Sequence, residues 1–264
     1  MGSRMQGRSA WRGAIITGAA SGIGRCFAET LAAQGTTVGL IDISAEGLAS
    51  VAETIRSRGG RAQSQTADVS VADTLDAAVQ GLLPSLDTLD LVINCAAILG
   101  PGAFAEQTAA EFERVIRIDL LGTANVVRAV LPALRRSQGA IACLASTAAV
   151  HGWPSLGAYS AAKFGVAGFC DGVRAELARE GITLTAVFPL LIDTPLLAGA
   201  DRAPILRQGR RLPPAAVVQK TLAGVARRRP RVFIPQSVRV VAALHGVAPS
   251  LLDWYARRFG FAKS

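Results

Sequence analysis

The sequence predicts an α/β fold, a single-domain doubly wound parallel sheet of about seven strands with helices on both faces. Short apolar runs alternate with helical stretches along the chain. Several runs lack an alternation of polar and apolar residues, which is typical of strands covered on both faces. A glycine-rich turn stands between the first run and a helical stretch. A ligand is therefore expected beyond the carboxyl ends of the strands.

Five runs read as strands, and they lie at residues 14–17, 37–41, 89–93, 140–144 and 182–187. The two longest helices are expected near residues 108–136 and 157–180. Each strand, the helix that follows it and the next strand make one βαβ unit. The repetition of this unit favours a parallel sheet.

The chain is expected to form one domain over residues 1–264, with a flexible N-terminus at 1–12. Residues 195–214 contain four prolines, the first of which is Pro195, and show no clear periodicity. We therefore interpret them as a loop that covers the site. Residues 232–264 are expected to form a basic amphipathic extension.

Composition favours a globular protein with a large core, since 50% of the residues are hydrophobic and 18% are charged. The four cysteines lack Cys-x-x-Cys spacing, so neither a disulfide framework nor a zinc site is indicated, and no metal is implied. We find no export signal and no apolar run of about 18 residues. The expectation is a cytoplasmic protein, with peripheral membrane contact as the alternative.

The net charge of +9 is concentrated in the last quarter of the chain, where residues 201–264 carry 13 Lys and Arg against 2 Asp and Glu. Residues 1–200 carry 15 against 17. Such a basic tail contributes to packing between helices or subunits, or binds an anionic membrane. No nucleic-acid partner is predicted, because no recognition motif accompanies the arginine cluster at residues 227–231.

A glycine-rich turn follows the first predicted strand and reads Thr17-Gly18-Ala19-Ala20-Ser21-Gly22-Ile23-Gly24. Glycines let the backbone turn sharply and bring N–H groups against a phosphate at a helix N-terminus. A turn of this kind that binds nothing is the alternative, and the flanking strand and helix make that alternative weaker.

This turn resembles the cofactor loop of the short-chain dehydrogenase/reductase family, and the resemblance runs from about Gly13 to Thr194. It implies a Rossmann-like fold, a nicotinamide cofactor and a homodimer or homotetramer. The cofactor-binding residues that the motif implies are Gly18, Ser21, Gly22, Ile23 and Gly24.

Asp42 ends the second predicted strand, where an acidic side chain accepts hydrogen bonds from an adenosine ribose. A carboxylate there repels a 2′-phosphate, so NAD is the expected cofactor. The resemblance further implies cofactor contacts from Asp68 and Val69, and from Asn94 and Ala96 in the segment that follows the predicted strand at residues 89–93. Ala97 stands where the family has glycine.

Tyr159 and Lys163 are separated by four positions on a predicted helix, so they lie on the same face. A tyrosine pKa is ordinarily near 10, and an ammonium about 4 Å away lowers it by enough to give a base near neutral pH. Ser146 precedes Tyr159 by thirteen positions. In the family that this pattern resembles, the serine holds the substrate oxygen, the tyrosine transfers its proton, and the lysine orients the ribose.

Asp119 stands where the family has an asparagine whose backbone carbonyl holds a water in a proton relay. A carboxylate there preserves that relay or, if close, stabilises the Lys163 ammonium and opposes the Tyr159 phenolate.

The segment after the last predicted strand resembles the family's Pro-Gly segment, with Pro189, Ile192 and Thr194 at the nicotinamide end of the cofactor and Leu190 in place of glycine. His151 and His245 lack partners in sequence and are not expected to do acid–base chemistry; His151 packs near Trp153 or lines the substrate cleft.

These residues predict an NAD-dependent oxidoreductase that acts on a lipophilic secondary alcohol or ketone. Two alternatives stay open, a reductase of acyl-chain ketones and a non-catalytic NAD(H)-sensing or scaffold protein. Catalysis is assigned to Ser146, Tyr159, Lys163 and Asp119.

Overall fold

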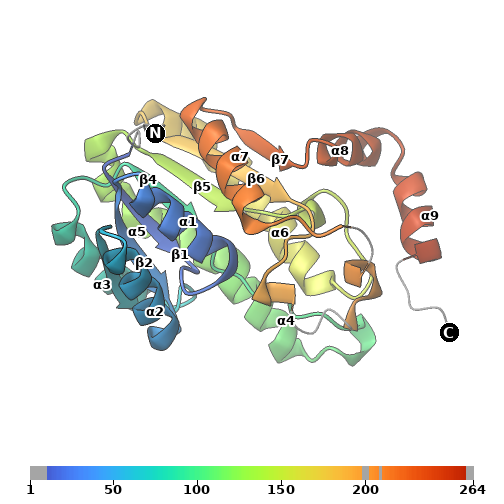
Figure 1. Cartoon of the computed structure of the whole chain (residues 1–264). Helices are drawn as coiled ribbons and strands as arrows, with labels where there is room; N and C mark the ends of the chain where they lie inside the picture. Colours follow the sequence, from blue (N-terminus) through green and yellow to red (C-terminus); the bar gives the residue numbers. More distant parts are fainter. Residues whose placement is uncertain (1–10, 198–201, 208–209, 260–264) are drawn as a thin grey trace, which may run out of the picture.

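The computed structural model describes residues 11–197, 202–207 and 210–259. Their strands form one parallel sheet, in the order β3-β2-β1-β4-β5-β6-β7 (Figure 1). This order confirms the expected doubly wound sheet, because the chain moves outward from β1 first to one edge and then, from β4, to the other. The strands are β1 Gly13–Thr17, β2 Thr37–Asp42, β3 Ala62–Thr66, β4 Leu91–Asn94, β5 Ala140–Leu144, β6 Thr183–Pro189 and β7 Arg231–Ile234.

Helices cover both faces of the sheet. One core cluster joins the strands to α1, α2 and α7, and a second joins them to α3, α5 and α6. The helices are α1 Gly22–Ala33, α2 Ala45–Ser57, α3 Ala72–Leu82, α4 Ala109–Val115, α5 Gly122–Ser137, α6 Gly157–Arg179, α7 Pro214–Ala226, α8 Val238–Val247 and α9 Pro249–Phe259. Short 3-10 turns lie at Leu83–Ser85, Phe104–Glu106, Thr147–Ala149, Pro195–Leu197 and Pro204–Arg207.

Two strands were missed by the reading of apolar runs. The edge strand β3 is mostly polar, and of its residues only Ala62 is fully buried, because it has a neighbour on one side only. Strand β7 lies at residues assigned to the C-terminal extension, yet it pairs with β6 from Ala186↔Arg231 to Pro189↔Ile234. The extension beyond the sheet therefore begins after residue 234 and consists of α8 and α9, which project from the body (Figure 1).

The helix expected near 108–136 is a continuous helical run with a change of pitch in the middle. A capping box between Thr108 and Glu111 starts α4. A π-helical segment, Ile116–Leu121, then joins α4 to α5 and contains Asp119. π-Helical turns are rare in proteins, and many of those that occur lie at functional sites.

The two ends of the described chain differ from the expectation in detail. Residues 1–10 of the predicted flexible N-terminus lie outside the described residues, but Arg12 donates its backbone N–H to Asp90 and Trp11 accepts from Thr36. Within residues 195–214 the described parts contain two 3-10 turns. None of the described helices is long and apolar enough to cross a membrane.

Candidate active site

The glycine-rich turn between β1 and α1 is compact at three glycines. Gly18 and Gly22 have positive φ values of 64° and 53°, a conformation that glycine adopts without strain. A Cβ on Gly24 would lie 2.0 Å from the carbonyl oxygen of Gly18. The turn thus closes onto its own helix, and α1 begins with no acidic side chain in its first turn. Its free N–H groups are available to an anion.

A buried chain of hydrogen bonds ties this turn to the ends of β4 and α5. The Thr17 hydroxyl donates to Asn94 Oδ1 at 2.6 Å, and Asn94 Nδ2 donates to the Thr123 hydroxyl at 2.9 Å. The backbone N–H groups of Cys95 and Ala96 donate to Thr17. Asn94 therefore holds the glycine-rich turn in place through hydrogen bonds. Its side chain does not line the cavity that opens in front of this turn.

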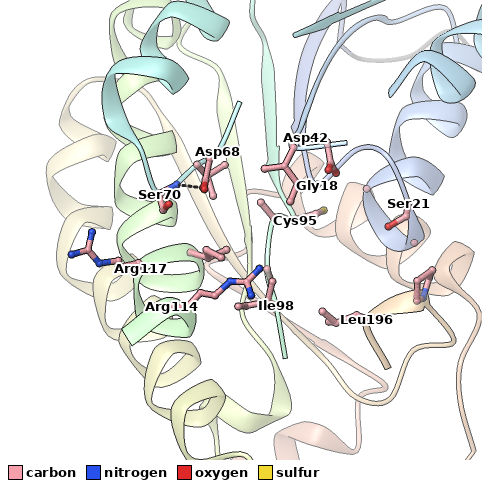
Figure 2. A pocket seen from close by; sticks show the side chains of 18 of the residues that line it. Gly18, Ser21, Asp42, Asp68, Ser70, Cys95, Ile98, Arg114, Arg117 and Leu196 are labelled. Atoms are coloured by element: carbon pink, nitrogen blue, oxygen red, sulfur yellow. Dashed lines mark hydrogen bonds between the residues drawn. The ribbon is translucent and has the colours of Figure 1, made fainter. Parts of the chain in front are cut away.

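A cavity of about 720 Å³ opens in front of the turn (Figure 2). Ten residues that the sequence assigned to cofactor binding line it: Gly18, Ser21, Gly22, Ile23, Gly24, Asp42, Asp68, Val69, Ala96 and Thr194. The Asp42 carboxylate accepts from the backbone N–H groups of Ala20 and Ser44, both at 3.1 Å, and stays partly exposed at the end of β2.

The opposite wall includes residues that the sequence did not identify. Arg114 on α4 extends toward Ile98 inside the cavity, whereas the Arg117 side chain points outward (Figure 2). Cys95 lies between them and the glycine turn. No local motif marks Arg114, because it reaches the cavity only through the packing of α4 against α6 and the π-helical segment Ile116–Leu121.

This cavity fits a dinucleotide. A glycine cradle that a Cβ would fill, free N–H groups at α1 and a carboxylate at the end of β2 are the features that pyrophosphate and ribose require. Arg114 adds a cation on the facing wall.

A second cavity of about 340 Å³ adjoins the first. The two share the lining residues Ile23, Cys95, Ala97, Thr194 and Leu196. Ser146, Tyr159 and Lys163 line the second cavity, together with Pro189 and Ile192. The structure thus brings the three predicted catalytic side chains together in the second cavity, which adjoins the first.

The serine and tyrosine come from adjacent structural elements. Ser146 follows β5, and its Oγ accepts from the Ala148 backbone N–H at 3.1 Å, while a hydrogen bond with Tyr159 lowers the pKa of the phenol. Tyr159 is in the first turn of α6. The ammonium of Lys163, one turn later, is 5.5 Å from the centre of the Tyr159 ring.

Lys163 is buried between two oxygen acceptors. Its Nζ donates to the carbonyl oxygen of Leu144 at 3.1 Å and lies 3.1 Å from Asp119 Oδ2. Both ends of this ion pair are buried, with Lys163 3% and Asp119 0% exposed. An ammonium has three N–H groups, so one remains for a further acceptor such as a ribose hydroxyl.

The pKa of Tyr159 differs from the sequence-based expectation. Burial raises the pKa and is the largest effect; Lys163 lowers it, but Asp119 raises it again, and the net direction is upward. The expected lowering was wrong because it left out the loss of hydration on burial. The opposing effect of a carboxylate at position 119, which the sequence raised as an alternative, adds to that of burial.

The Asp119 backbone carbonyl, which the resemblance assigns to a relay water, has a protein partner and a second lone pair, so the relay stays a prediction. That oxygen accepts the Thr123 hydroxyl at 2.6 Å, while the Asp119 side chain bonds the Ile98 backbone N–H at 2.8 Å and pairs with Lys163. In this chain the side chain reaches the lysine directly.

The two histidines do have partners. His151 Nδ1 and His245 Nδ1 are 3.4 Å apart, which joins α8 to the segment before α6. The His151 ring also packs edge-on against Trp153, with centroids 4.9 Å apart. Trp153 in turn contacts Tyr255 of α9, and both rings line the second cavity. The described residues contain no cluster of three or more metal-ligating side chains.

Comparison with known proteins agrees with this geometry. The family model described as short chain dehydrogenase matches residues 12–204. The cyclohexanol dehydrogenase of an Acinetobacter species is 35% identical over 196 residues, covering 74% of this chain and 78% of that protein.

Two solved structures are also similar. A short chain dehydrogenase/reductase from Burkholderia phymatum in complex with NAD has a TM-score of 0.82 and 24% identity, covering 92% of this chain and 95% of that one. A variant of the actinorhodin polyketide ketoreductase with NADPH has a TM-score of 0.78 and 28% identity, with 86% and 97% covered.

The glycine turn, the parallel sheet and the Ser146, Tyr159 and Lys163 arrangement agree with a match that covers most of the chain. This protein belongs to the short-chain dehydrogenase/reductase family of oxidoreductases, which have a Rossmann-like fold and a nicotinamide cofactor.

Proposed function

We propose that this protein interconverts a lipophilic secondary alcohol and the corresponding ketone, with NAD(H) as the hydride carrier. The observation that carries the proposal is that Ser146, Tyr159 and Lys163 line one cavity, and that this cavity adjoins the one that fits a dinucleotide. One cavity fits the dinucleotide, and the other is the place for the substrate.

The side chains have distinct tasks in this reaction. The Ser146 hydroxyl holds the substrate oxygen, and the Tyr159 hydroxyl exchanges a proton with that oxygen. Lys163 stays charged between Leu144 and Asp119 and uses its remaining N–H to orient the cofactor ribose. When bound, the nicotinamide cofactor gives or accepts the hydride at the substrate carbon.

The lining of the second cavity supports a lipophilic substrate. Its apolar residues include Leu99, Leu144, Trp153, Leu156, Leu190, Leu191, Leu196, Leu197, Ile205 and Leu206. Among the described lining residues only Lys163 and Arg210 carry a charge. Few polar groups in this lining can therefore orient a substrate. Such a lining suits a compact ring or chain that carries one oxygen function.

NAD(H) is proposed over NADP(H) because Asp42 ends β2 at the wall of the dinucleotide cavity, and Ile43, the next residue, is apolar and exposed. A 2′-phosphate beside this carboxylate would meet like charge. Related structures hold either cofactor, so the choice is tested directly with both.

The test is a screen by nicotinamide absorbance, in both directions and with both cofactors. The panel holds cyclohexanols, larger cyclic alcohols, steroids, terpenoid and long-chain alcohols, β-ketoacyl thioesters and carboxylated analogues that could meet Arg210. We expect turnover of at least one lipophilic alcohol or ketone. Turnover of β-ketoacyl thioesters alone would favour the acyl-chain alternative. Tight NADH binding without turnover of any member would favour the sensing protein.

We further propose that α8 and α9 contact an anionic membrane surface. Val247, Leu251 and Trp254 are 83%, 51% and 55% exposed, and Arg257 and Arg258 lie on the same helix as Trp254. Apolar side chains beside cations suit an interface of this kind. Tyr255 on α9 lines the substrate cavity, so such contact would bring the cavity close to lipophilic substrates.

The membrane proposal is tested by co-sedimentation of the full chain with anionic and neutral vesicles at low and high salt. The paired variant Val247→Asp/Leu251→Asp should lose binding to anionic vesicles, whereas Val71→Asp, an exposed apolar residue before α3, should retain it. Equal, negligible sedimentation in every condition would leave packing or subunit contact as the role of these helices. Sedimentation velocity of the same proteins reports whether the chain forms the homodimer or homotetramer that the family resemblance implies.

A further inference from the structure

The Asp119 carboxylate faces two donors in a buried site. The Ile98 backbone N–H donates to Oδ1 at 2.8 Å, and the Lys163 ammonium lies 3.1 Å from Oδ2. An asparagine has one acceptor oxygen and one NH₂ group, so in either orientation it would set N–H against one of these donors. Burial raises the pKa of Asp119, and Lys163 and the Ile98 N–H oppose that effect. The two donors suit an ionised carboxylate, and Asp119 is the residue that makes Lys163 half of an ion pair.

This ion pair changes the electrostatic field at Tyr159. A lone ammonium favours the phenolate, but a carboxylate 3.1 Å from that ammonium offsets much of its charge. Cys95, after β4, and Cys143, in β5, also interact with Lys163. Burial raises the pKa of the Cys95 thiol, and a hydrogen bond with Cys170 followed by burial raises the pKa of the Cys143 thiol, so both carry no charge near neutral pH. Among the described residues the field at Tyr159 is thus governed by Lys163 and Asp119.

We propose that Asp119 is a positioning residue that offsets the charge of Lys163 and keeps Tyr159 a phenol at neutral pH, so that the site is set for ketone reduction. This inference rests on the proposed function. In reduction the carbonyl carbon receives the hydride from the reduced cofactor, and the carbonyl oxygen receives the Tyr159 proton. The resulting phenolate takes a proton back from water. Alcohol oxidation needs the phenolate first and reaches full rate only in alkaline solution.

The direction of the shift is consistent with this assignment. Burial and Asp119 both raise the pKa of Tyr159, against the lowering by Lys163 and by the hydrogen bond with Ser146. Burial lowers the pKa of Lys163, but the negative charge of Asp119, joined by that of Tyr159 once the phenolate forms, outweighs it and holds the lysine as an ammonium. Proton exchange with the substrate is then left to Tyr159.

The chain offers a direct test, because it contains two tyrosines, Tyr159 and Tyr255. In the Tyr255→Phe background, phenolate absorbance reports Tyr159 alone, with Tyr159→Phe/Tyr255→Phe as the blank. Rapid pH jumps, read before any unfolding, give the midpoint of the titration. Adding Asp119→Asn should lower this midpoint by about one pH unit or more, a tenfold change in acid constant.

Two further variants make the result specific. Asp76→Asn removes an exposed carboxylate from α3 and should leave the midpoint unchanged. Asp119→Ser is smaller and uncharged and has no NH₂ group to face a donor, and it should shift the midpoint down even if Asp119→Asn does not fold. A midpoint that stays in place or rises in the folded Asp119 variants would overturn the proposal.

Activity supplies a second, separate readout. The acid limb of kcat/KM for oxidation and the alkaline limb for reduction should both move to lower pH in Asp119→Asn, by the same shift as the phenolate titration. The absorbance titration needs no substrate, so it decides the role of Asp119 even if no alcohol or ketone is turned over. An unchanged titration with normal turnover would instead overturn the inference and leave the proposed function standing.

Discussion

Gly24 at the start of α1 faces the carbonyl oxygen of Gly18 so closely that a Cβ on Gly24 would lie 2.0 Å from it. The contact is with backbone, so the added atom could be accommodated only by moving the turn. We predict that Gly24→Ala weakens cofactor binding and destabilises the fold by about 1–3 kcal/mol. Calorimetric titration with NADH and thermal melts measure both effects.

Gly246 in α8 provides the matched control, because a Cβ there meets nothing within 4 Å. Gly246→Ala should keep cofactor affinity and leave stability unchanged or raised by up to about 1 kcal/mol. Wild-type NADH affinity in Gly24→Ala would contradict the proposed cradle.

Removing one partner of the buried Lys163–Asp119 pair leaves the other charge without compensation. Lys163→Met is therefore expected to cost about 3–5 kcal/mol of unfolding free energy. The double variant Lys163→Met/Asp119→Asn should recover much of this loss, because the buried charge is gone and the Ile98 N–H keeps an acceptor. Urea denaturation of the wild type, the two single variants Lys163→Met and Asp119→Asn, and the double variant gives the coupling energy. A coupling energy near zero would show that the two charges do not interact.

Tyr159→Phe retains the ring and removes the proton that is transferred. We expect kcat to fall by about 10²- to 10⁴-fold, with NADH affinity nearly unchanged. Tyr255→Phe makes the same chemical change at the wall of the substrate cavity and should alter KM more than kcat. Turnover by Tyr159→Phe close to that of the wild type would refute its assigned role.

Asp42→Ala should reduce the preference for NAD(H) over NADP(H) by about tenfold or more, since the carboxylate no longer repels a 2′-phosphate; tenfold corresponds to about 1.4 kcal/mol. The comparison is kcat/KM with each cofactor for both proteins. Arg114→Ala, on the facing wall, should weaken both cofactors alike. A wild type that prefers NADP(H) would show the assignment of Asp42 to be wrong.

Acidification should loosen the contact between α8 and the body. Burial lowers the pKa of His151, the positive charge of His245 lowers it further, and Asp253 only partly opposes them. The folded state then binds fewer protons than the unfolded state just below the usual histidine pKa of about 6.5, so stability falls as the pH falls through that range.

His245→Gln is expected to reduce this pH dependence, because the second cation is lost. The difference in Tm between about pH 7.5 and about pH 5.5 measures this pH dependence, because the usual histidine pKa lies between these two pH values. Identical pH dependence in both proteins would exclude a contribution from the His151–His245 contact.

The parts of the site that the sequence predicted are those whose geometry depends on residues close together in the chain. The glycine turn is continuous in sequence, and Tyr159 and Lys163 share a helix face, so their geometry hardly depends on distant elements. Asp119 was suspected to approach Lys163, but the 3.1 Å contact arises from packing of the π-helical segment against α6. Arg114 and Tyr255 reach the cavities from α4 and α9, and no sequence pattern encodes the packing that brings them there.

The strands show a similar division. Runs of apolar residues mark the central strands because helices cover both faces. The polar edge strand β3 has no such signal, and its only fully buried residue is Ala62.

The residues that wall the substrate cavity are divided along the chain in a way that matters for its evolution. The family match ends at residue 204, but Ile205, Leu206, Arg210 and Tyr255 complete the cavity from beyond that point. In the proposed reaction, the residues for proton transfer lie before residue 204, and residues after it complete the fit to the substrate. A chimera that joins residues 1–204 to the tail of a relative would therefore keep the chemistry and acquire a different range of substrates.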